Sequence, residues 1–374
     1  MRLIKHIGLL LLMMIFFVPD DVQAQRQLKN SKSYLKKRNV KKVGKYKGGS
    51  IHFDKNKRYL SAGMSLDATN YFGDLAPSSK NGSTNPSLTR PAFSLFAQFR
   101  YSPNLTFRGS LSWARLKADD FESQDPYGES SRFRYVRNLS FRNDIKELAF
   151  TAVWDIFGNH GTFLNRVFVT PYVFAGVAVF HHNPRAKAPE VDRSGVPLEE
   201  AGQWVALRPL GTEGQLSPHY TTQEGERLHV KPYSTIQPSI PVGLGFRAKL
   251  NKRWDFEFEV GYRYLFTDYI DDISGMYVDL GALDSELAKV MSDRSAEPVS
   301  ASGQPRDFEA INAVTSQITY TSKYDGCEYT VYAGYGHEGV DNNRGKAEDN
   351  DMYIVTSFRI SYIITGSFKR AKFR

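Results

Sequence analysis

Residues 254–266 read WDFEFEVGYRYLF, and this stretch decides the fold class. Every second residue from Trp254 to Phe266 is apolar, and mostly charged or small residues lie between them. A period of two is typical of a β-strand with one apolar and one polar face. At 13 residues the stretch is also long enough to cross a membrane as a tilted strand.

The same alternation recurs in seven other segments. They cover residues 60–69, 93–101, 105–114, 147–156, 167–180, 239–250 and 353–364, of which 167–180 is apolar on both faces. The eight segments are joined by connections of about 21, 3, 28, 9, 55, 3 and 85 residues, so long and short alternate throughout. Bacterial outer-membrane barrels alternate long outer loops with short periplasmic turns in this way.

We therefore predict an all-β fold, an eight-stranded antiparallel transmembrane outer-membrane β-barrel over residues 59–366. Its long outer loops fall near 70–90, 117–144, 181–235 and 267–351, and its periplasmic turns are short. A soluble sandwich or lipocalin-like barrel is the alternative, but it would point its large aromatic side chains inward.

Composition excludes several classes of protein. The 374 residues hold one cysteine, Cys327, which excludes an internal disulfide framework and any cysteine-only zinc or iron–sulfur site. The mean hydropathy is -0.43, and no apolar run near 18 residues follows the N-terminus. Both observations argue against helical membrane spans.

The first 24 residues have the features of a secretory signal peptide. Arg2 and Lys5 precede an apolar run over 7–18, and Val22-Gln23-Ala24 offers a small-residue cleavage site. The mature chain is then expected to begin at Gln25 and to reach the outer membrane. An even number of strands places both termini in the periplasm.

Residues 25–58 carry 13 basic side chains and one acid, Asp54, for a net charge of +12. Such a tail is expected to be disordered alone. It could dock on an acidic or phosphate-bearing partner, and a solvated spacer arm is the equally weighted alternative. The candidate contact residues are Lys36, Lys37, Arg38, Lys41 and Lys42. Nucleic acid is not expected as a partner of an exported chain, and residues 367–374 form a short basic C-terminal tail.

The polar faces of the segments carry six acidic and six basic residues. They are Asp67, Arg100, Arg108, Glu147, Asp155, Arg247, Lys249, Asp255, Glu257, Glu259, Arg263 and Arg359. Because eight strands leave room only for side chains, charges in the lumen must pair, and we expect a plugged barrel. Aromatic residues near the segment ends are expected at the two membrane interfaces. They are Tyr71, Tyr101, Trp113, Trp154, Trp254 and Phe266.

The longest loop carries the remaining signals. Residues 283–294 have helical spacing, and 329–335 could form an accessory strand that extends the barrel or covers its mouth. Asp268, Asp271 and Asp272 could meet Glu348, Asp349 and Asp351 at the outer rim and hold calcium. A solvated acidic loop is the preferred interpretation, because no full calcium-loop spacing is present.

No motif predicts catalysis or a cofactor. Residues 334–339 (GYGHEG) match the spacing of a dinucleotide-binding loop, but no helix is expected after them to receive a pyrophosphate. The histidines lack any recognisable nucleophile motif. His181 and His182 are the one position worth testing for hydrolase activity.

Five strings of sequence resemble one known family. They are NYFGDL (70–75), RNLSFRN (137–143), PYVFAG (171–176), LGTEGQ (210–215) and YRYLFTDYIDDIS (262–274). They are similar to the PorG-type outer-membrane β-barrels of the type IX secretion system of Bacteroidota. The positions that carry the resemblance include Tyr71, Gly73, Asp74, Thr267, Asp268, Tyr269, Asp271 and Asp272.

The resemblance implies a non-catalytic integral outer-membrane component of a protein secretion machine. It also implies partners: outer-membrane lipid, and a periplasmic ring built by a lipoprotein and its partner protein. The +12 tail and the long loops depart from the family's shorter pattern. Two alternatives stay open, an outer-membrane lipid-modifying enzyme and an adhesin or small-solute barrel that acts through its outer loops.

Overall fold

The computed structural model describes residues 53, 57–75, 88–129, 131–219, 221–223, 226–228, 230–339, 341–348 and 350–364. The chain divides into two units, Met1–His52 and Phe53–Arg374, and all the described residues lie in the second. The predicted signal peptide, the tail residues from Lys36 to Lys42 and residues 367–374 lie outside the described residues.

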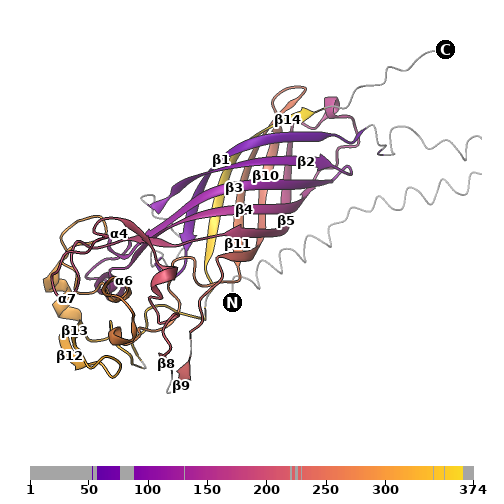
Figure 1. The fold of residues 1–374 in the computed structure, drawn as a ribbon. Coiled ribbons are helices and arrows are strands. Elements are labelled where there is room, and N and C mark those ends of the chain that lie inside the picture. Colours follow the sequence, from indigo (N-terminus) through magenta and orange to yellow (C-terminus); the bar gives the residue numbers. More distant parts are fainter. Residues whose placement is uncertain are drawn as a thin grey trace, which may run out of the picture. The chain divides into compact units, whose positions relative to one another are not determined.

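Eight strands close into an antiparallel barrel (Figure 1). They are β1 (Leu60–Phe72), β2 (Arg90–Arg100), β3 (Leu105–Asp119), β4 (Ser140–Asp155), β5 (Val169–His181), β10 (Ile236–Lys249), β11 (Trp254–Leu265) and β14 (Met352–Ile364). Each strand pairs with the next, and β14 pairs with β1 to complete the ring. The predicted eight-stranded barrel is confirmed, with a strand at each of the eight alternating segments.

The outer surface of the barrel is apolar. Strand register places Met64, Leu95, Leu111, Leu148 and Val179 side by side in one row across five strands. Each of these side chains is about half exposed or more in the isolated chain, and Leu111 is 61% exposed. An exposed apolar belt around the outside of a closed barrel is the lipid-facing surface of an outer-membrane protein.

Five of the six predicted interface aromatics lie on this outer surface. Tyr101, Trp113, Trp154, Trp254 and Phe266 are all exposed. The prediction for Tyr71 was wrong, because Tyr71 is 6% exposed and continues the inward-facing row of β1.

No helix within the described ranges is long and apolar enough to cross a membrane.

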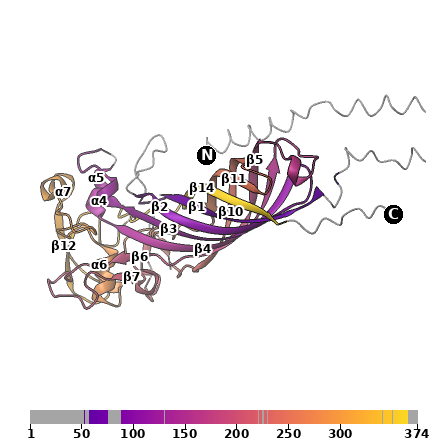
Figure 2. The ribbon, with the colours of Figure 1, turned by 90° about the horizontal axis from the view of Figure 1, so that it is seen from above.

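Strands β3 and β4 continue together well past the other strands (Figure 2). The predicted loop 117–144 was therefore too long, since the ladder runs on until Asp119 faces Ser140. Arg115 and Asp144 lie opposite each other in this extension, and Arg115 Nε donates to Asp144 Oδ1 at 2.6 Å. This cross-strand ion pair helps to hold the two strands together beyond the rest of the barrel.

The long connections fold into a cap at one end of the barrel (Figures 1 and 2). Its elements are α4 (Asp120–Ser123), α5 (Arg132–Arg137), β6 (Arg185–Lys187), β7 (Trp204–Ala206), η5 (Arg208–Leu210), β8 (Thr221–Gln223), β9 (Glu226–Leu228), η6 (Leu280–Ala282), α6 (Glu286–Ser292), α7 (Phe308–Val314), β12 (Gln317–Thr321) and β13 (Glu328–Tyr332). The predicted helix over 283–294 is present as α6. The predicted accessory strand is present as β13, but it pairs with β12 in a separate sheet and does not extend the barrel.

An apolar core closes the cap end of the barrel. It includes Leu75, Phe141, Ile145, Phe180, Leu265, Ile270 and Ile273, each no more than 1% exposed. These residues come from three barrel strands, β4, β5 and β11, and from the loops that follow β1 and β11. The mouth is consequently filled by side chains that pack against one another.

Candidate functional site

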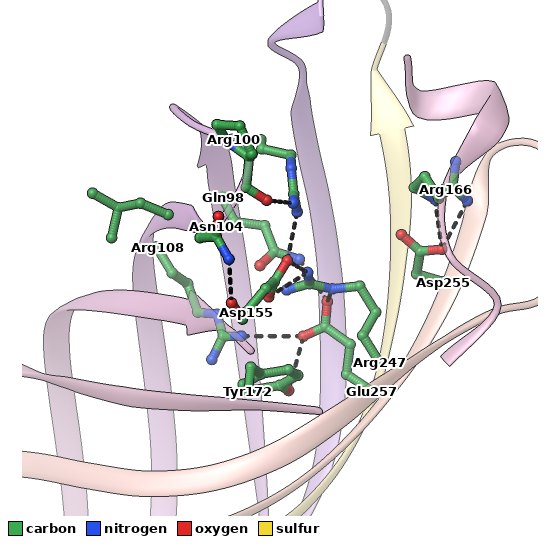
Figure 3. Close-up of polar contacts among 12 residues, drawn as sticks. Gln98, Arg100, Asn104, Arg108, Asp155, Arg166, Tyr172, Arg247, Asp255 and Glu257 are labelled. Atoms are coloured by element: carbon green, nitrogen blue, oxygen red, sulfur yellow. Dashed lines mark hydrogen bonds and ion pairs between the residues drawn. The ribbon is translucent and has the colours of Figure 1, made fainter. Parts of the chain in front are cut away.

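The lumen holds a continuous network of charged side chains, drawn in part in Figure 3. The predicted lumen charges Asp67, Arg100, Arg108, Glu147, Asp155, Arg247, Asp255, Glu257, Glu259, Arg263 and Arg359 are all buried. Strand alternation places them there, because each lies on the inward-facing row of its strand.

Glu257 is the centre of the network. Arg247 Nε donates to its Oε1 at 2.9 Å, and Gln98 Nε2 donates to the same oxygen at 2.8 Å (Figure 3). Arg108 Nη2 donates to its Oε2 at 3.1 Å. Both carboxylate oxygens of a fully buried glutamate are therefore satisfied, as burial of a charge requires.

Ion pairs extend the network in both directions. Towards the cap, Glu259 binds Arg108 Nη1 at 2.6 Å and Arg359 Nε at 3.1 Å. Towards the short turns, Asp155 binds Arg100 Nη1 at 2.7 Å and Arg247 Nη1 at 3.2 Å. The lumen is thus bridged from strand to strand along most of its length.

One member of the predicted set was wrong, and one was missed. Lys249 is only partly buried and donates to the carbonyl of Leu164 at 2.7 Å, outside the network. Arg166 takes its place, with Nη2 2.7 Å from Asp255 Oδ1. Arg166 lies directly after the turn η4 (Phe163–Asn165), where no strand periodicity could have indicated its inward direction.

The spaces left within the lumen are small. One cavity of about 20 Å³ lies among Asp67, Glu147, Arg263 and Arg359, and another of about 10 Å³ lies near Arg100 at the opposite end. Each has room for about one water molecule. The network and the apolar core at the mouth together leave no open passage along the described barrel.

A second cluster of mostly buried, mostly polar residues surrounds the junction of barrel and cap, and we call it the collar. It comprises Tyr71, Gly73, Asp74, Glu213, Asp268, Asp271, Asp272, Arg344 and Asp351. At its centre, Tyr71 Oη lies 2.8 Å from Asp271 Oδ2 and 2.5 Å from Asp351 Oδ1. A Cβ on Gly73 would lie 1.9 Å from the Tyr71 hydroxyl, so only glycine fits beside this pair.

Two arginines tie the collar to the cap. Arg137 donates to both oxygens of Asp120, at 2.8 and 2.9 Å, and also to the carbonyl of Asp74. Arg344 is fully buried, and its Nη1 binds Glu213 Oε1 at 3.0 Å. The side chain of Glu213 also accepts from the backbone amide of Ser274 at 3.0 Å.

Asp272 has a place of its own in the collar. Its φ of +69° is unusual for a residue other than glycine. Thr212 Oγ1 donates to Oδ2 at 2.5 Å, and Tyr233 Oη donates to Oδ1 at 2.6 Å. Tyr233 in turn stacks on Tyr269, with the ring centroids 4.8 Å apart. The loop conformation is thus fixed by contacts to both carboxylate oxygens.

Burial raises the pKa of several collar carboxyl groups. The pKa of Asp351 is raised to about 7 by desolvation and by the charge of Asp74. The pKa of Asp268 is raised to about 9 by desolvation and by the charge of Asp351. Desolvation and the charge of Asp351 also raise the pKa of Asp271. The collar therefore holds protons that solvated aspartates would release.

The preference for a solvated acidic loop was wrong for Asp268, Asp271 and Asp272, which are at most 7% exposed. Asp351 joins Asp271, as the rim prediction expected, whereas Glu348 is exposed and Asp349 lies outside the described residues. Within the described part of the chain, no group of three or more acidic, histidine or cysteine side chains is placed to hold a metal ion. The calcium alternative at these aspartates therefore gains no support from the described residues.

The collar is where the resemblance-bearing strings meet. Residues 70–75, 137–143, 210–215 and 262–274 all contribute to it, although they are far apart in the sequence. Thr267 takes part through its carbonyl, which accepts from the amide of Asp351 at 3.2 Å. The fifth string, 171–176, lies in β5, where Tyr172 Oη donates to Glu259 at 2.6 Å.

The two histidines considered for hydrolysis have different surroundings. His181 is exposed at the end of β5. His182 is fully buried, its Nε2 lies 3.0 Å from the Ser234 carbonyl, and its ring stacks on Tyr233. Burial lowers its pKa to about 4. Its Nδ1 has no hydrogen-bond partner in the described ranges, so the structure pairs His182 with no nucleophile there.

The GYGHEG string follows β13 and forms a turn. Gly334 and Gly336 have φ values of +94° and +64°, which favour glycine. The carbonyl of Gly336 accepts from Tyr320 Oη at 3.1 Å. These glycines therefore have a role in the turn itself.

One cavity in the cap measures about 800 Å³, and we call it the cap cavity. It lies between the turns 191–197 and 299–305, and α6 and β13 contribute to its walls. This cavity was not predicted from the sequence. The two turns that flank it could have been recognised as a pair, because both contain the pattern Val-x-x-Ser-Gly-x-Pro.

Comparisons with known proteins describe what the chain is similar to. A family described as a domain of unknown function, DUF6089, matches residues 52–193. No curated protein matches the chain.

Similar solved structures include three bacterial barrels. Ail, the attachment invasion locus protein of Yersinia pestis, solved with the heparin analogue sucrose octasulfate, is 8% identical, with a TM-score of 0.31 over 82% of this chain and 99% of its own. The outer membrane protein OprG from Pseudomonas aeruginosa is 8% identical, with a TM-score of 0.33 over 83% and 98%. Neisserial surface protein A is 9% identical, with a TM-score of 0.30 over 82% and 96%.

At these identities and TM-scores the likenesses say nothing about function. The assignment as an outer-membrane β-barrel rests on the chain's own closed strand pairing and apolar belt.

Proposed function

We propose that this chain is a non-catalytic integral component of a type IX-like protein secretion machine, and that it anchors a periplasmic ring complex to the outer membrane. The observation that carries the proposal is the filled lumen. A barrel whose interior is occupied by the Glu257 network and whose mouth is packed with apolar side chains is suited to work through its surfaces. Anchoring requires surfaces and a membrane-embedded body, and it requires no passage.

The resemblance supplies the kind of machine. Three of its five strings supply residues of the collar and a fourth contacts it through Arg137, so the positions that resemble the PorG-type barrels lie together in one structural unit. On this proposal both termini and the short turns face the periplasm. The ring lipoprotein and its partner protein would then meet the turns and the tail that contains Lys36, Lys37 and Arg38.

The direct test is purification of the tagged chain from its native outer membrane in mild detergent, with mass spectrometry of the proteins that accompany it. Recovery of periplasmic ring proteins is the expected result. The matched control is an unrelated outer-membrane barrel purified in parallel. A chain that emerges without ring proteins, while the ring remains intact elsewhere in the envelope, would contradict the proposal.

The contribution of the tail is tested separately. Deletion of residues 25–58 removes a net charge of +12, and we expect less ring protein to be recovered, most clearly at low salt. A substitution series that replaces Lys36, Lys37, Arg38, Lys41 and Lys42 by glutamine, with the length kept, separates charge from spacing. Unchanged recovery at low salt from both variants would exclude an electrostatic role.

A second candidate, an adhesin or ligand-binding barrel, is favoured by the cap cavity of about 800 Å³. This volume falls in the range of small-molecule sites. The two functions use opposite ends of the barrel, so one does not preclude the other. The surroundings of His181 and His182 lend the lipid-modifying alternative no support.

A further inference from the structure

The cap cavity is bounded on two sides by turns of matching sequence and shape. Residues 191–197 (VDRSGVP) and 299–305 (VSASGQP) share valine, serine, glycine and proline at equivalent positions. In each turn the valine and the proline form an isolated bridge. The glycines, Gly195 and Gly303, have φ values of +82° and +81°.

The hydrogen bonds of the two turns correspond one to one. The Asp192 amide donates to the Val196 carbonyl at 2.8 Å, and the Ser300 amide donates to the Gln304 carbonyl at 2.9 Å. Val191 and Val299 line the cavity, and both are about 40% exposed. The cavity is therefore flanked by two similar turns, each with an exposed apolar side chain.

The edge of strand β13 that lies opposite β12 faces the cavity and is only partly occupied. The Ala333 amide donates to the Ser316 carbonyl. The backbone N–H and C=O groups of the odd-numbered residues of β13 therefore point towards β12, and those of the even-numbered residues point away from it. Arg193 confirms this direction, since its Nη2 donates to the Thr330 carbonyl at 2.6 Å from the cavity side. The backbone groups of Glu328 and the amide of Thr330 are thus left out of the ladder with β12.

The charges of the lining determine what such an edge would accept. The lining carries six acids and four bases: Glu190, Asp192, Glu286, Asp293, Glu297 and Glu328 against Lys187, Arg193, Lys289 and Arg294. Three of the bases are already bound, Arg193 to Asp293, Lys289 to Glu286 and Arg294 to Glu297, at 2.8 to 3.0 Å. Glu190 and Glu328 are exposed, and neither pairs with a cation among the described residues.

We propose that the cap cavity binds an extended polypeptide segment bearing lysine or arginine. The segment adds to the outer edge of β13 by main-chain hydrogen bonds, as in β-augmentation. Its basic side chains meet Glu190 and Glu328, and its apolar side chains contact Val191 and Val299. Anionic ligands such as phosphorylated lipid or sulfated sugar are disfavoured by the acidic surplus. This inference does not depend on the proposed role in secretion.

The experiment uses the purified full-length mature chain in detergent micelles and a fluorescein-labelled peptide of alternating lysine and valine. Fluorescence polarisation is expected to show saturable binding that weakens with added salt. A Glu190→Gln, Glu328→Gln double variant is expected to bind about five- to tenfold more weakly. The matched control, Glu199→Gln with Glu309→Gln, removes two exposed acids outside the lining and is expected to bind as the unchanged chain does.

Two further probes test the mode of binding. The same peptide with an N-methyl group on every residue has no backbone N–H to donate to either side, so it cannot form an edge ladder and its binding should be lost. Cys327, the single cysteine of the chain, is exposed and lines the cavity, so bound peptide should slow its reaction with a maleimide.

The proposal would be overturned by several results. These are absence of saturable binding of the lysine–valine peptide, equal binding of a glutamate–valine peptide, or full affinity in the Glu190→Gln, Glu328→Gln variant. Saturable binding of a labelled sulfated oligosaccharide to the chain in the absence of peptide, lost when the cap cavity is blocked by maleimide at Cys327, would also overturn it, because it would indicate an anion site in place of a basic-peptide site. Heat-modified mobility on gels shows in each case that the barrel is folded.

Discussion

The Tyr71 hydroxyl has a single proton and two carboxylate neighbours. It can donate to Asp271 or to Asp351, and the remaining contact requires that a carboxyl group itself holds a proton. The raised pKa of Asp351, about 7, is consistent with this arrangement. A shared proton is the simplest way in which the collar can bury these two acids side by side.

The collar should consequently become less stable as the pH rises. An unfolded aspartate has a pKa near 3.9, so the folded collar binds more protons than the unfolded chain above that pH. The stabilisation is complete below pH about 4 and is lost as the pH rises through about 7 for Asp351 and about 9 for Asp268. Urea unfolding in detergent should give a lower midpoint at pH about 9 than at pH about 6.

A matched pair of variants tests this origin of the pH dependence. Asp351→Asn keeps a hydrogen-bonding group beside Tyr71 but removes a titrating one, so its unfolding midpoint should change less with pH. Asp284→Asn alters an exposed acid and should behave as the unchanged chain does. If all three proteins show the same pH dependence, the shared proton is not its cause.

In the lumen, the stability lost on removing a side chain depends on how many charged partners are left without it. Glu257→Ala leaves Arg108 and Arg247 without one of their carboxylates, and removal of one member of a buried pair costs about 3 to 5 kcal/mol. The free energy of unfolding, measured by denaturant titration in lipid vesicles, should fall by about this amount. Glu309→Ala, at an exposed cap position, should leave it almost unchanged.

At the scale of elements, the alternation along each strand determines which substitutions the membrane tolerates. Phe150 lies on the outer face of β4, opposite Gly109, and is 56% exposed in the isolated chain. Phe150→Arg should lower the folding free energy in vesicles by about 2 to 4 kcal/mol, because it places a charge among lipid tails. Val196→Arg, at an equally exposed cap position, should have little effect. Equal effects of the two variants would mean that β4 does not face lipid.

Elements were predictable from sequence where a local period governs them. Eight strands follow from period-2 alternation, and the same alternation assigns Arg108, Glu257 and Arg359 to the lumen. The prediction for Tyr71 was wrong because it followed the tendency of aromatic residues at strand ends to lie at the membrane interface. The alternation of β1, which points Tyr71 inward, was the better guide. The extension of β3 and β4 was missed because the predicted strands were limited to 105–114 and 147–156, whereas the ladder continues through charged residues such as Arg115 and Asp144, which face each other.

The collar could not have been predicted in the same way. Asp268, Asp271 and Asp272 lie in a loop with no period, and their burial depends on Tyr71, Thr212 and Tyr233 from distant parts of the chain. Arg166 enters the lumen from a turn for equally nonlocal reasons. The acidic-rim prediction brought Asp271 and Asp351 together, and the resemblance marked Tyr71, but neither indicated that Tyr71 would lie between the two aspartates or that they would be buried.

At the scale of the whole barrel, the filled lumen predicts electrical silence. Reconstituted into a planar bilayer, the protein should produce no stable single-channel conductance, since the lumen cavities hold about one water molecule each. A large open-channel barrel added to the same bilayer provides the control. Regular ion-conducting steps from the purified chain would show that the network opens, and would favour a small-solute function.

The continuous ladder of β3 and β4 joins the cap rigidly to the barrel. Because the hydrogen bonds that cross the bilayer continue to Asp119 and Ser140, that hairpin has no hinge at the membrane surface. A change in membrane thickness that tilts the barrel therefore tilts the cap by the same angle. Conversely, a force applied to the cap tilts the barrel in the lipid. The lipid therefore contributes to the orientation in which the cap is presented.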